Sequence, residues 1–585
     1  MRVLTFKLFL VARLSQVFAQ YTETNDPLVV TPAIDTFINS ILTDWGVPGG
    51  LSVAVVKKTG ESSWNVETKG YGNAKSDKSA VTSSTLFNIA SNSKLFTALS
   101  TGMLVADPAT NPPISWKTKV ESIVPEWSLS NPVASKGANL IDLISHRVGM
   151  PRHDYAYHAT DKLSDHIKKY RHFKPSAELR EAFQYNNNMY ALLSYLPTVL
   201  LPSSPNLARY VKAKIFDPLD MSATTYSYQI AAQSGNLAEG FARQGMKSAL
   251  DAGTPRALPY WDPHSTEDGD LIAGAGGIIS NAVDMAKWLQ TLLLNGKNPK
   301  TGSVVIPAEA IQTVSTGHTV DTTVPYGQVP LLTPAVYGGG QTIRNYKGHV
   351  IVEHGGSVSG FNSMVARLPV DGLGIAVLTN DDAIGGYMSF AIVSRLVDEA
   401  LGIQPEEWKT SFESFISAGY SAAPQPLPRP ANATDPKGGF KDLAGIYEDK
   451  GYGRLELCLF PPPPVVSSGC RDVAANVTMV LPGSVDPTVP TFIARWNKQY
   501  STYLRFTHID GNTFNVASLN PFPAGNASEP GWFMTNNVGT TAEFGRDKGR
   551  RGFGLFGGFW GAGAGVPSPS TGNLVQRSEV WFNKA

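Results

Sequence analysis

The chain has 585 residues, of which 42% are hydrophobic and 17% are charged, and its formal net charge is +1 at pH 7. This composition is globular, and the length is too great for one compact core, so we expect at least two domains. The balanced charge argues against a nucleic-acid-binding surface, which would need an excess of basic residues.

The first residues have the features of a secretory signal peptide. Arg2 supplies a positive charge, an apolar run follows, and residues 17–19 fit a small-residue cleavage pattern, so we expect the signal at 1–19. Lys7 and Arg13 interrupt the apolar run, which leaves a signal anchor or an ordinary helix as alternatives. No later segment has the roughly 18 uncharged apolar residues of a membrane-spanning helix. The sequence therefore predicts a secreted protein without an integral membrane segment.

Helical and strand-like patterns alternate between residues 31 and 402, which predicts one domain of mixed α/β structure. Helices are expected at 32–45, 140–146, 188–196, 208–216, 281–294 and 387–401, and strands at 51–57, 63–71, 350–353 and 363–379. The last strand segment is interrupted by a turn at Asp371-Gly372. Residues 151–180 are rich in His, Tyr and charge but lack apolar periodicity, so we expect a long surface excursion there.

The composition changes after residue 402. Residues 403–437 contain the alternating prolines of an extended linker. From 438 to 585 short strand-like runs, one of them at 477–481, alternate with turn residues, which predicts an all-β barrel or sandwich. The Gly-rich segment 551–565 is expected to be a long mobile loop of this domain.

The chain has two cysteines, Cys458 and Cys470, which flank the Pro-rich loop 460–468. In an oxidising compartment they would pair and close this loop, and two unpaired buried thiols are the alternative. Three N-glycosylation sequons lie in the last third of the chain, at Asn432, Asn476 and Asn526.

The most informative pattern is Ser91-Asn92-Ser93-Lys94, where an extended apolar segment becomes a helix. Residues three apart share a helix face, so the Lys94 amine lies one turn above the Ser91 hydroxyl. A partly desolvated lysine can remove the serine proton or help another group to do so. The helix N-terminus favours developing negative charge. The spacing alone is equally typical of a helix cap followed by a solvated lysine.

Tyr185 and Asn187 precede a predicted helix and can be presented together from one tight turn. The tyrosine can act as a general base if a lysine ammonium lowers its pKa. The asparagine amide can bind the lysine or a substrate. A helix cap is the simpler interpretation of this pair in isolation.

His354, Gly355, Gly356 and Ser357 end a predicted strand. Two glycines there permit the close approach of a ligand to the backbone. The N–H groups of Ser357 and Ser91 can form an oxyanion hole, and His354 can orient the substrate or the tyrosine. A loop with a satisfied histidine is the alternative.

Other chemistries fit less well. The chain contains no G-x-S-x-G, H-E-x-x-H or P-loop pattern. The glycine cluster 274–277 lacks a surrounding dinucleotide fingerprint, so no cofactor is expected. Five histidines crowd one region, but their spacings match no common metal site, and no metal is expected. They are His146, His153, His158, His166 and His172.

The order of these motifs resembles the serine β-lactamase and penicillin-binding-protein-like hydrolases, in the class C β-lactamase and esterase branch. The resemblance covers residues 32–402, and relatives with this mixture of motifs look like fungal secreted proteins. It is carried by Phe87–Lys94, Tyr185–Asn187 and His354–Gly356, and three further segments agree, Leu143–Pro151, Phe216–Met221 and Ala275–Ser280.

This resemblance implies that Ser91 is the acylated nucleophile and Lys94 its activating partner. Tyr185 would be the general base, Asn187 a substrate and lysine contact, and His354–Ser357 the edge strand beside the acyl group. The implied fold is α/β (α+β), a central antiparallel sheet with helices on both faces and a helical insertion. The tail is similar to a lipocalin-like β-barrel module.

Two departures bear on the substrate. His354 stands where β-lactamases carry a lysine that helps to hold the substrate carboxylate, and Arg147-Val148 replaces the usual Thr-Ser. The first favours esters, amides or D-amino-acid peptides over β-lactams. The prediction is a secreted serine hydrolase of a small molecule or peptide that acts through an acyl-enzyme on Ser91. An acyltransferase of small-molecule biosynthesis and a catalytically silent binding protein are the alternatives, and the oligomeric state stays open.

Overall fold

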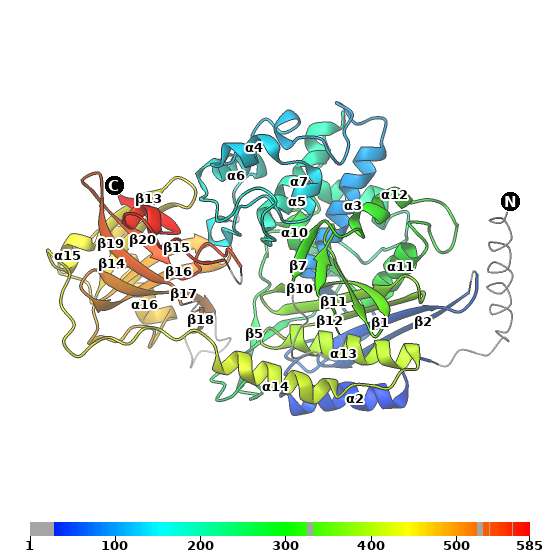
Figure 1. Cartoon of the computed structure of the whole chain (residues 1–585). Helices are drawn as coiled ribbons and strands as arrows, with labels where there is room; N and C mark the ends of the chain where they lie inside the picture. Colours follow the sequence, from blue (N-terminus) through cyan, green and yellow to red (C-terminus); the bar gives the residue numbers. More distant parts are fainter. Residues whose placement is uncertain are drawn as a thin grey trace, which may run out of the picture.

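Two bodies lie side by side in the computed structural model, a larger domain of helices around a sheet and a smaller barrel (Figure 1). The larger domain comprises residues 28–421, and the barrel comprises residues 438–585. The structure describes residues 28–61, 63–158, 160–323, 332–522, 531–536, 539–563 and 566–585. The expected signal at 1–19 lies outside this part of the chain.

An eight-stranded antiparallel sheet forms the centre of the larger domain, in the order β2-β1-β12-β11-β10-β9-β8-β7. β11 and β12 are buried along their whole length, because helices cover both faces of the sheet. The predicted turn at Asp371-Gly372 joins these two strands. The strands are β1 Gly50–Lys58, β2 Trp64–Gly72, β7 Thr319–Thr322, β8 Ala335–Tyr337, β9 Thr342–Tyr346, β10 His349–Val358, β11 Phe361–Leu368 and β12 Leu373–Thr379.

Helices α2, α13 and α14 cover one face of the sheet, and α3, α7 and α11 lie on the other side (Figure 1). α11 starts after its cap Asn281, whose side chain accepts the N–H of Asp284. These helices are α2 Pro32–Asp44, α3 Ser93–Ala106, α7 Asn187–Leu200, α11 Ala282–Leu293, α13 Gly385–Leu401 and α14 Trp408–Ser421. The sheet between two helical layers confirms the predicted fold class.

Shorter elements complete the larger domain. Two small antiparallel pairs join β3 to β6 and β4 to β5. The strands are β3 Phe87–Asn88, β4 Gly240–Gln244, β5 Thr254–Leu258 and β6 Ile279–Ser280. The helices are α4 Pro132–Gly137, α5 Leu140–Ile144, α6 Leu163–Lys169, α8 Leu207–Val211, α9 Tyr228–Gln233, α10 Ala273–Gly276 and α12 Ala308–Val314. None of the helices in the described ranges is long and apolar enough to cross a bilayer.

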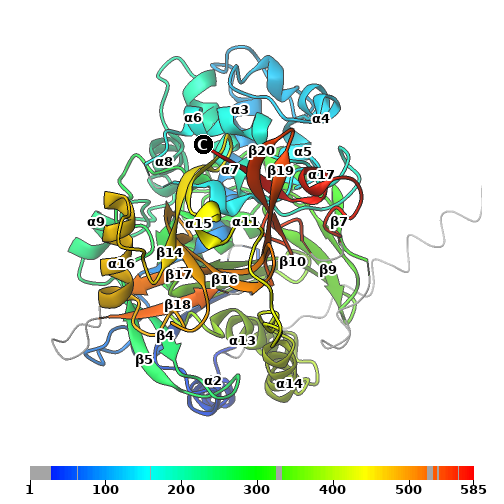
Figure 2. The same cartoon turned by 90° about the vertical axis from the view of Figure 1, so that its left-hand side faces the viewer.

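The smaller body is a closed barrel, which confirms the all-β prediction (Figure 2). Eight strands follow one another in the order β16-β15-β14-β13-β21-β20-β19-β17, and β17 pairs again with β16, while β18 adds to β17. The strands are β13 Gly445–Asp449, β14 Gly453–Phe460, β15 Thr491–Lys498, β16 Ser501–Asp510, β17 Thr513–Phe522, β18 Trp532–Asn536, β19 Thr541–Asp547, β20 Arg550–Phe556 and β21 Val580–Lys584. Its core contains buried aromatic rings, among them Phe492, Phe514, Phe544, Phe553 and Phe582.

Two sequence predictions within the barrel domain are wrong. The run 477–481 is not a strand but belongs largely to helix α16, Ser468–Val480, which buries Val473 and Val477 at helical spacing. The segment 551–565 is not simply a mobile loop, because it begins within strand β20. Gly552 and Gly554 of this strand are packing sites, since a Cβ would come within 2.4 Å of a ring atom of Trp581 at the first and within 2.6 Å of Ser578 Cβ at the second.

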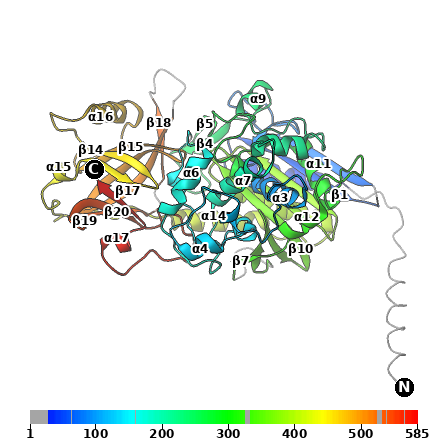
Figure 3. The ribbon, with the colours of Figure 1, turned by 90° about the horizontal axis from the view of Figure 1, so that it is seen from above.

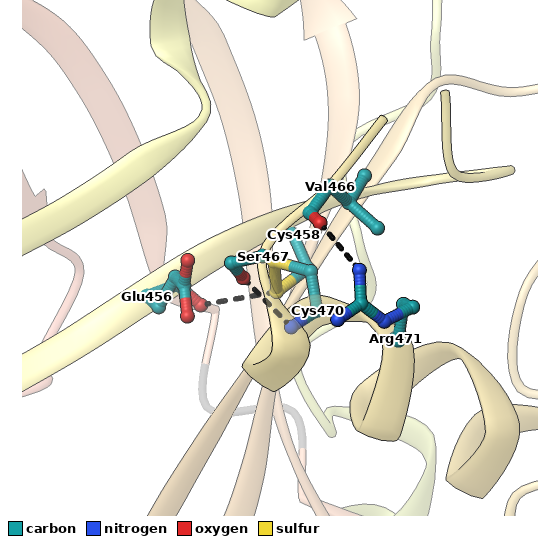
Figure 4. The surroundings of a disulfide bond; sticks show 6 residues. All are labelled: Glu456, Cys458, Val466, Ser467, Cys470 and Arg471. Atoms are coloured by element: carbon teal, nitrogen blue, oxygen red, sulfur yellow. Dashed lines mark hydrogen bonds between the residues drawn. A yellow bond between two sulfur atoms is a disulfide. The ribbon is translucent and has the colours of Figure 1, made fainter. Parts of the chain in front are cut away.

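A disulfide joins Cys458, at the end of β14, to Cys470, in the first turn of α16 (Figure 4). It is the pairing that an oxidising compartment favours. The Ser467 hydroxyl caps α16 by accepting the N–H of Cys470 at 3.0 Å. Of the sequons, Asn432 is exposed and Asn476 is half-buried, whereas Asn526 lies outside the described residues.

The prediction of a surface excursion at 151–180 is also wrong. This segment lies between the larger domain and the barrel, and α6 is near the barrel in Figure 3. The rings of Tyr157 and Phe173 are buried in the same hydrophobic cluster as Tyr452 and Phe559 of the barrel. The apolar residues of this segment are largely aromatic rings that do not recur at helical or strand spacing. They are covered in part by the barrel, which is distant in sequence, so apolar periodicity could not predict that the segment is buried.

The segment 403–437 is only partly extended. Helix α14 occupies its first part and packs on α13 through Phe412, whose ring lies 5.4 Å from that of Phe390. Trp408 is buried, and its indole N–H donates to Asp398 at 2.6 Å. The extended linker therefore begins only after α14.

Candidate active site

Ser91 lies in a tight turn between β3 and α3. The residue before it, Ala90, has a φ of +49°, in the left-handed region that alanine rarely adopts. Asn88 stabilises this conformation, because its side-chain oxygen accepts the N–H of Ala90 at 2.6 Å. From β11, the Ser363 hydroxyl donates to the carbonyl of Ile89 at 2.8 Å. A strained and doubly anchored turn thus presents the Ser91 hydroxyl.

The Lys94 side chain is fully buried directly above this hydroxyl. Its Nζ lies 3.1 Å from Ser91 Oγ and donates to the carbonyl of Ala275 at 2.7 Å. Burial lowers the pKa of Lys94 well below its ordinary value, and the positive charge of Arg152 lowers it further, while Asp154 opposes this shift more weakly. The site therefore favours a neutral amine beside the serine.

The glycine cluster after residue 273 positions the carbonyl partner of the lysine. Thr97 on α3 donates to the carbonyl of Gly274 at 2.7 Å. A Cβ on Gly274 would come within 2.8 Å of the Tyr190 carbonyl oxygen and of Ser194 Cβ on α7. A glycine is therefore required for α10 to fit between α3 and α7 and to bring Ala275 to Lys94.

Tyr185 lies against the same pair of groups. Lys94 Nζ lies 4.8 Å from its ring centre. Burial raises the pKa of Tyr185, although the neighbouring Ser91 hydroxyl and the charge of Arg152 lower it in part. This direction is opposite to the lysine-lowered pKa that the sequence prediction assumed. Tyr185 is a neutral phenol beside a favoured neutral amine.

His146 is a site residue whose role sequence reasoning missed. Its ring lies 4.5 Å from that of Tyr185, and its Nδ1 accepts the N–H of Asn186 at 3.1 Å. Burial lowers the pKa of His146 well below its ordinary value, and the nearby Lys94 and His354 lower it further. His146 is therefore neutral and holds the Tyr185 turn. His146 lies within the segment 143–151, and the family resemblance of that segment was the sequence signal that could have pointed to its role.

Asn187 opens onto the site but does not bind the lysine. Its amide donates to Asp154 Oδ1 at 3.2 Å, and it lines a cavity together with Ser91. Within the described ranges we find no hydrogen bond between Asn187 and Lys94. The predicted substrate contact remains sterically possible from this position, whereas the lysine contact is replaced by the bond to Asp154.

His354 is buried at the base of the site and carries no charge. Burial and the nearby Lys94 lower the pKa of His354 to about 3. In the neutral ring, Nδ1 donates to the Gly355 carbonyl at 2.5 Å, so Nε2 accepts from the Tyr337 hydroxyl at 3.0 Å. Tyr337 is another residue that sequence reasoning missed. At position 354, where β-lactamases have their lysine, this protein therefore has a neutral ring.

The end of β10 forms an edge beside Ser91. Its pairing with β9 ends at Glu353, whereas its pairing with β11 continues to Val358. A Cβ on Gly356 would lie 2.4 Å from the Ile89 carbonyl oxygen, so glycine allows this close approach. Gly355 and Ser357 are exposed and face the cavity around Ser91.

Two cavities meet at Ser91. The first, of about 720 Å³, runs along β10 toward α13 and α14 and is lined there by Tyr387, Phe390 and Phe415. The second, of about 420 Å³, runs from Ser91 to the barrel. Arg152 borders both. The predicted residues Tyr185, His354, Gly355, Gly356 and Ser357 line the first, and Asn187 lines the second.

An antiparallel sheet between helices, with a serine and a buried lysine one helical turn apart beside an edge strand, defines the penicillin-binding-protein-like class. A family model described as Beta-lactamase matches residues 40–392, and the chain belongs to that family.

Relatives and a solved structure agree with this assignment. The chain is 30% identical to an unguisins hydrolase of Aspergillus campestris, over 72% of this chain and 76% of that protein. It is also 30% identical to an unguisins hydrolase of Aspergillus violaceofuscus, over 74% and 78% of the two chains. An octameric penicillin-binding protein homologue from Pyrococcus abyssi has a TM-score of 0.53 and 18% identity over 94% of this chain and 99% of its own. The predicted family resemblance is confirmed.

Proposed function

We propose that the protein is a serine hydrolase that cleaves an ester, amide or D-amino-acid peptide bond through an acyl-enzyme on Ser91. The observation that carries this proposal is the 3.1 Å contact of the Ser91 hydroxyl with the buried Lys94 amine, which can accept its proton, beside the ring of Tyr185. The hydrolase names of the two fungal relatives support hydrolysis over acyl transfer.

The pKa directions favour Lys94 as the base that activates the serine. Ser91 Oγ attacks the carbonyl carbon, and its proton passes to the neutral Lys94 amine. The N–H groups of Ser91 and Ser357 bind the oxyanion. Tyr185 then donates its proton to the leaving group and regains one from the Lys94 ammonium. In deacylation, water attacks the acyl carbon, its proton passes to Lys94, and Ser91 leaves with a proton returned through the same pair.

The same charges disfavour β-lactams as substrates. A neutral His354, with a pKa of about 3, offers no positive charge to the carboxylate that such a ligand carries. The unpaired edge of β10 can instead bind the backbone of an extended peptide through N–H and C=O groups. Amides and peptides, which need no carboxylate partner at position 354, therefore fit this site better.

A panel of acyl compounds tests the proposal. We expect D-amino-acid amides or short-chain activated esters to be hydrolysed at least about tenfold more efficiently than a chromogenic β-lactam, since one unmet charge contact is worth that much. Rapid quenching and intact-mass measurement should show a transient acyl adduct, which peptide mapping assigns to Ser91. Absence of any adduct across the panel would favour a silent binding protein. Products formed only in the presence of added amines or alcohols would favour an acyltransferase.

We also propose that the protein is secreted. The signal-like sequence at 1–19 and the disulfide between Cys458 and Cys470 support an oxidising destination. Expression in a secreting yeast should release a protein whose N-terminal sequence begins at Gln20. Removal of N-glycans from the same sample tests the sequons at Asn432, Asn476 and Asn526. A retained protein that begins at Met1 would contradict secretion.

A further inference from the structure

The barrel contributes a wall to the cavity that contains Ser91. The described residues lining the second cavity come from the larger domain and also from Tyr500, Asn536 and the loop 558–561. Tyr500 follows β15, Asn536 ends β18, and the loop 558–561 follows β20. Three separate parts of the barrel therefore reach the nucleophile, and we call the space between them and Ser91 the barrel subsite.

The walls of the barrel subsite are largely aromatic. Tyr155 stacks on Phe559, with ring centres 4.9 Å apart and planes inclined by 22°. The Asn536 amide donates to the Tyr155 hydroxyl at 3.3 Å and links this ring to β18. Tyr500 and Trp560 complete the barrel side. The half-buried rings of Tyr155 and Tyr500, backed by the buried rings of Phe559 and Trp560, provide binding area for an apolar group.

Hydrogen bonds hold this wall in place without a ligand. The buried Glu579 carboxylate accepts the N–H groups of Gly558 at 2.8 Å and Trp560 at 3.2 Å. The carbonyl of Trp560 accepts the N–H of His153 at 2.8 Å, and the carbonyl of residue 561 accepts that of Arg152 at 3.2 Å. The barrel loop is thus fixed at both ends to neighbouring structure, and the subsite is formed in advance.

The subsite contains no net charge. Arg152 and Asp154 are the charged side chains among its described lining residues, and they pair with each other at 2.5 Å. Asp154 also accepts hydrogen bonds from Tyr157 at 2.9 Å and from Asn187 at 3.2 Å. Because the pair cancels its own charge, the subsite offers a charged substrate terminus no net attraction to offset its loss of hydration.

We propose that the barrel subsite binds an apolar, preferably aromatic, side chain of a peptide substrate next to the scissile bond. The enzyme would then cleave internal bonds of uncharged peptide segments, with the chain continuing on the other side of Ser91 into the cavity lined by Tyr387, Phe390 and Phe415. This inference rests on the proposed function, because it takes Ser91 as the nucleophile. It adds the class of substrate and assigns its selection to the barrel.

Capped peptides that vary at one position test the subsite. Peptides with blocked ends carry Phe, Ala, Glu or Lys on either side of the scissile bond, in D and L forms, and kcat/KM is measured for each. On one side of the bond we expect Phe to be preferred over Ala by roughly 10- to 100-fold, as for burial of an aromatic group. Glu and Lys at that position should be poorer than Ala. Peptides with a free terminus there should be cleaved less well than capped ones.

Variants of the two half-buried rings localise the preference. In Tyr155→Ala and in Tyr500→Ala the Phe preference should fall to below about threefold on that side only. Because the preference is the ratio of the Phe and Ala values for one protein, a loss of reactivity common to both peptides leaves it unchanged. Tyr420→Ala, at an exposed tyrosine on α14, is the matched control and should keep the full preference. Thermal unfolding checks that each variant is folded.

The outcomes separate the two proposals. A wild type that shows no preference, or variants that keep it, would overturn the barrel subsite even if the peptides are still cleaved through an acyl-enzyme on Ser91. A better cleavage of free-ended, charged peptides would also overturn it. If the wild type neither hydrolyses an activated ester such as p-nitrophenyl acetate nor forms an acyl adduct, the proposed function itself is contradicted.

Discussion

The Ser91→Ala protein is expected to hydrolyse an activated ester at least about a thousandfold more slowly than the wild type. Without the hydroxyl, Lys94 and Tyr185 have no nucleophile to deprotonate, and only the oxyanion donors and binding contacts remain. The transient acyl adduct in intact-mass spectra should disappear. Steady-state kcat and a fluorophosphonate labelling assay provide the measurement.

Ser359→Ala is the matched control for this substitution. Ser359 is exposed in the turn between β10 and β11, outside both cavities, and its replacement should leave kcat within about twofold of wild type. Ser91 is only half-buried, so the unfolding free energy of Ser91→Ala should change by less than about 1 kcal/mol. If Ser91→Ala is labelled and turns over like the wild type, the acyl-enzyme lies elsewhere.

Lys94→Met should lower kcat/KM by roughly 10²- to 10⁴-fold, the range of general-base catalysis. Methionine has similar length and no amine, so it fills the buried space but accepts no proton. The substitution removes the cost of burying an amine, which raises the free energy of unfolding. It also leaves the Ala275 carbonyl without its partner, which lowers it. The unfolding free energy in urea should therefore stay within about 1 kcal/mol of wild type. A fully active Lys94→Met protein would assign the base role to Tyr185.

The pH dependence of kcat/KM in the wild type and in Lys94→Met shows whether Lys94 acts in its neutral form. In the wild type, kcat/KM should rise with pH as Lys94 loses its proton, at a pH well below the ordinary lysine pKa. It should fall only at a pH above the ordinary pKa of a phenol, since the pKa of Tyr185 is raised. His354 adds no limb near neutrality because its pKa is about 3. Lys94→Met should lose the acid limb, and Ser359→Ala should keep it.

Stability should respond to pH in the same window. The unfolded chain binds a proton at Lys94 up to the ordinary lysine pKa, whereas the folded chain releases it at lower pH. Between these two pKa values the wild type gains stability as pH rises, relative to Lys94→Met. Below the folded pKa both states hold the proton, and the difference is constant. If the wild type instead loses stability relative to Lys94→Met as pH rises, Lys94 is charged in the folded protein.

The sequence was informative wherever a short segment carries its own geometry. Ser91 and Lys94 are one helical turn apart, so their contact follows from local structure, and strands β1, β2, β11 and β12 follow from apolar patterning, whereas β7, β8 and β9 were not predicted. The pKa of Tyr185 could not be predicted, because it depends on burial by distant segments. The roles of His146 and Tyr337 likewise arise from packing between elements far apart in the chain.

The largest error, at 151–180, has the same physical origin. A helix or strand that packs within its own domain shows apolar residues at regular spacing. Tyr157 and Phe173 do not, because the barrel covers part of their surface. In α16 the helical spacing of Val473 and Val477 competed with a run of β-branched residues, and tertiary packing decided for the helix. The glycines of β20 are typical of a loop in sequence. In the structure they lie in a strand, because Trp581 and Ser578 leave no room for a Cβ at these positions.

The shared hydrophobic cluster between the larger domain and the barrel has a consequence for the order of assembly. Ribosomes release a chain from its N-terminus, and domains generally fold in that order. Ser91, Lys94 and Tyr185 therefore emerge long before the barrel strands that cover the rings of residues 151–180. During synthesis the serine can meet its base while one wall of its pocket does not yet exist. If the barrel subsite selects the substrate as proposed, selectivity is acquired only after the reactive groups have met, when the barrel folds.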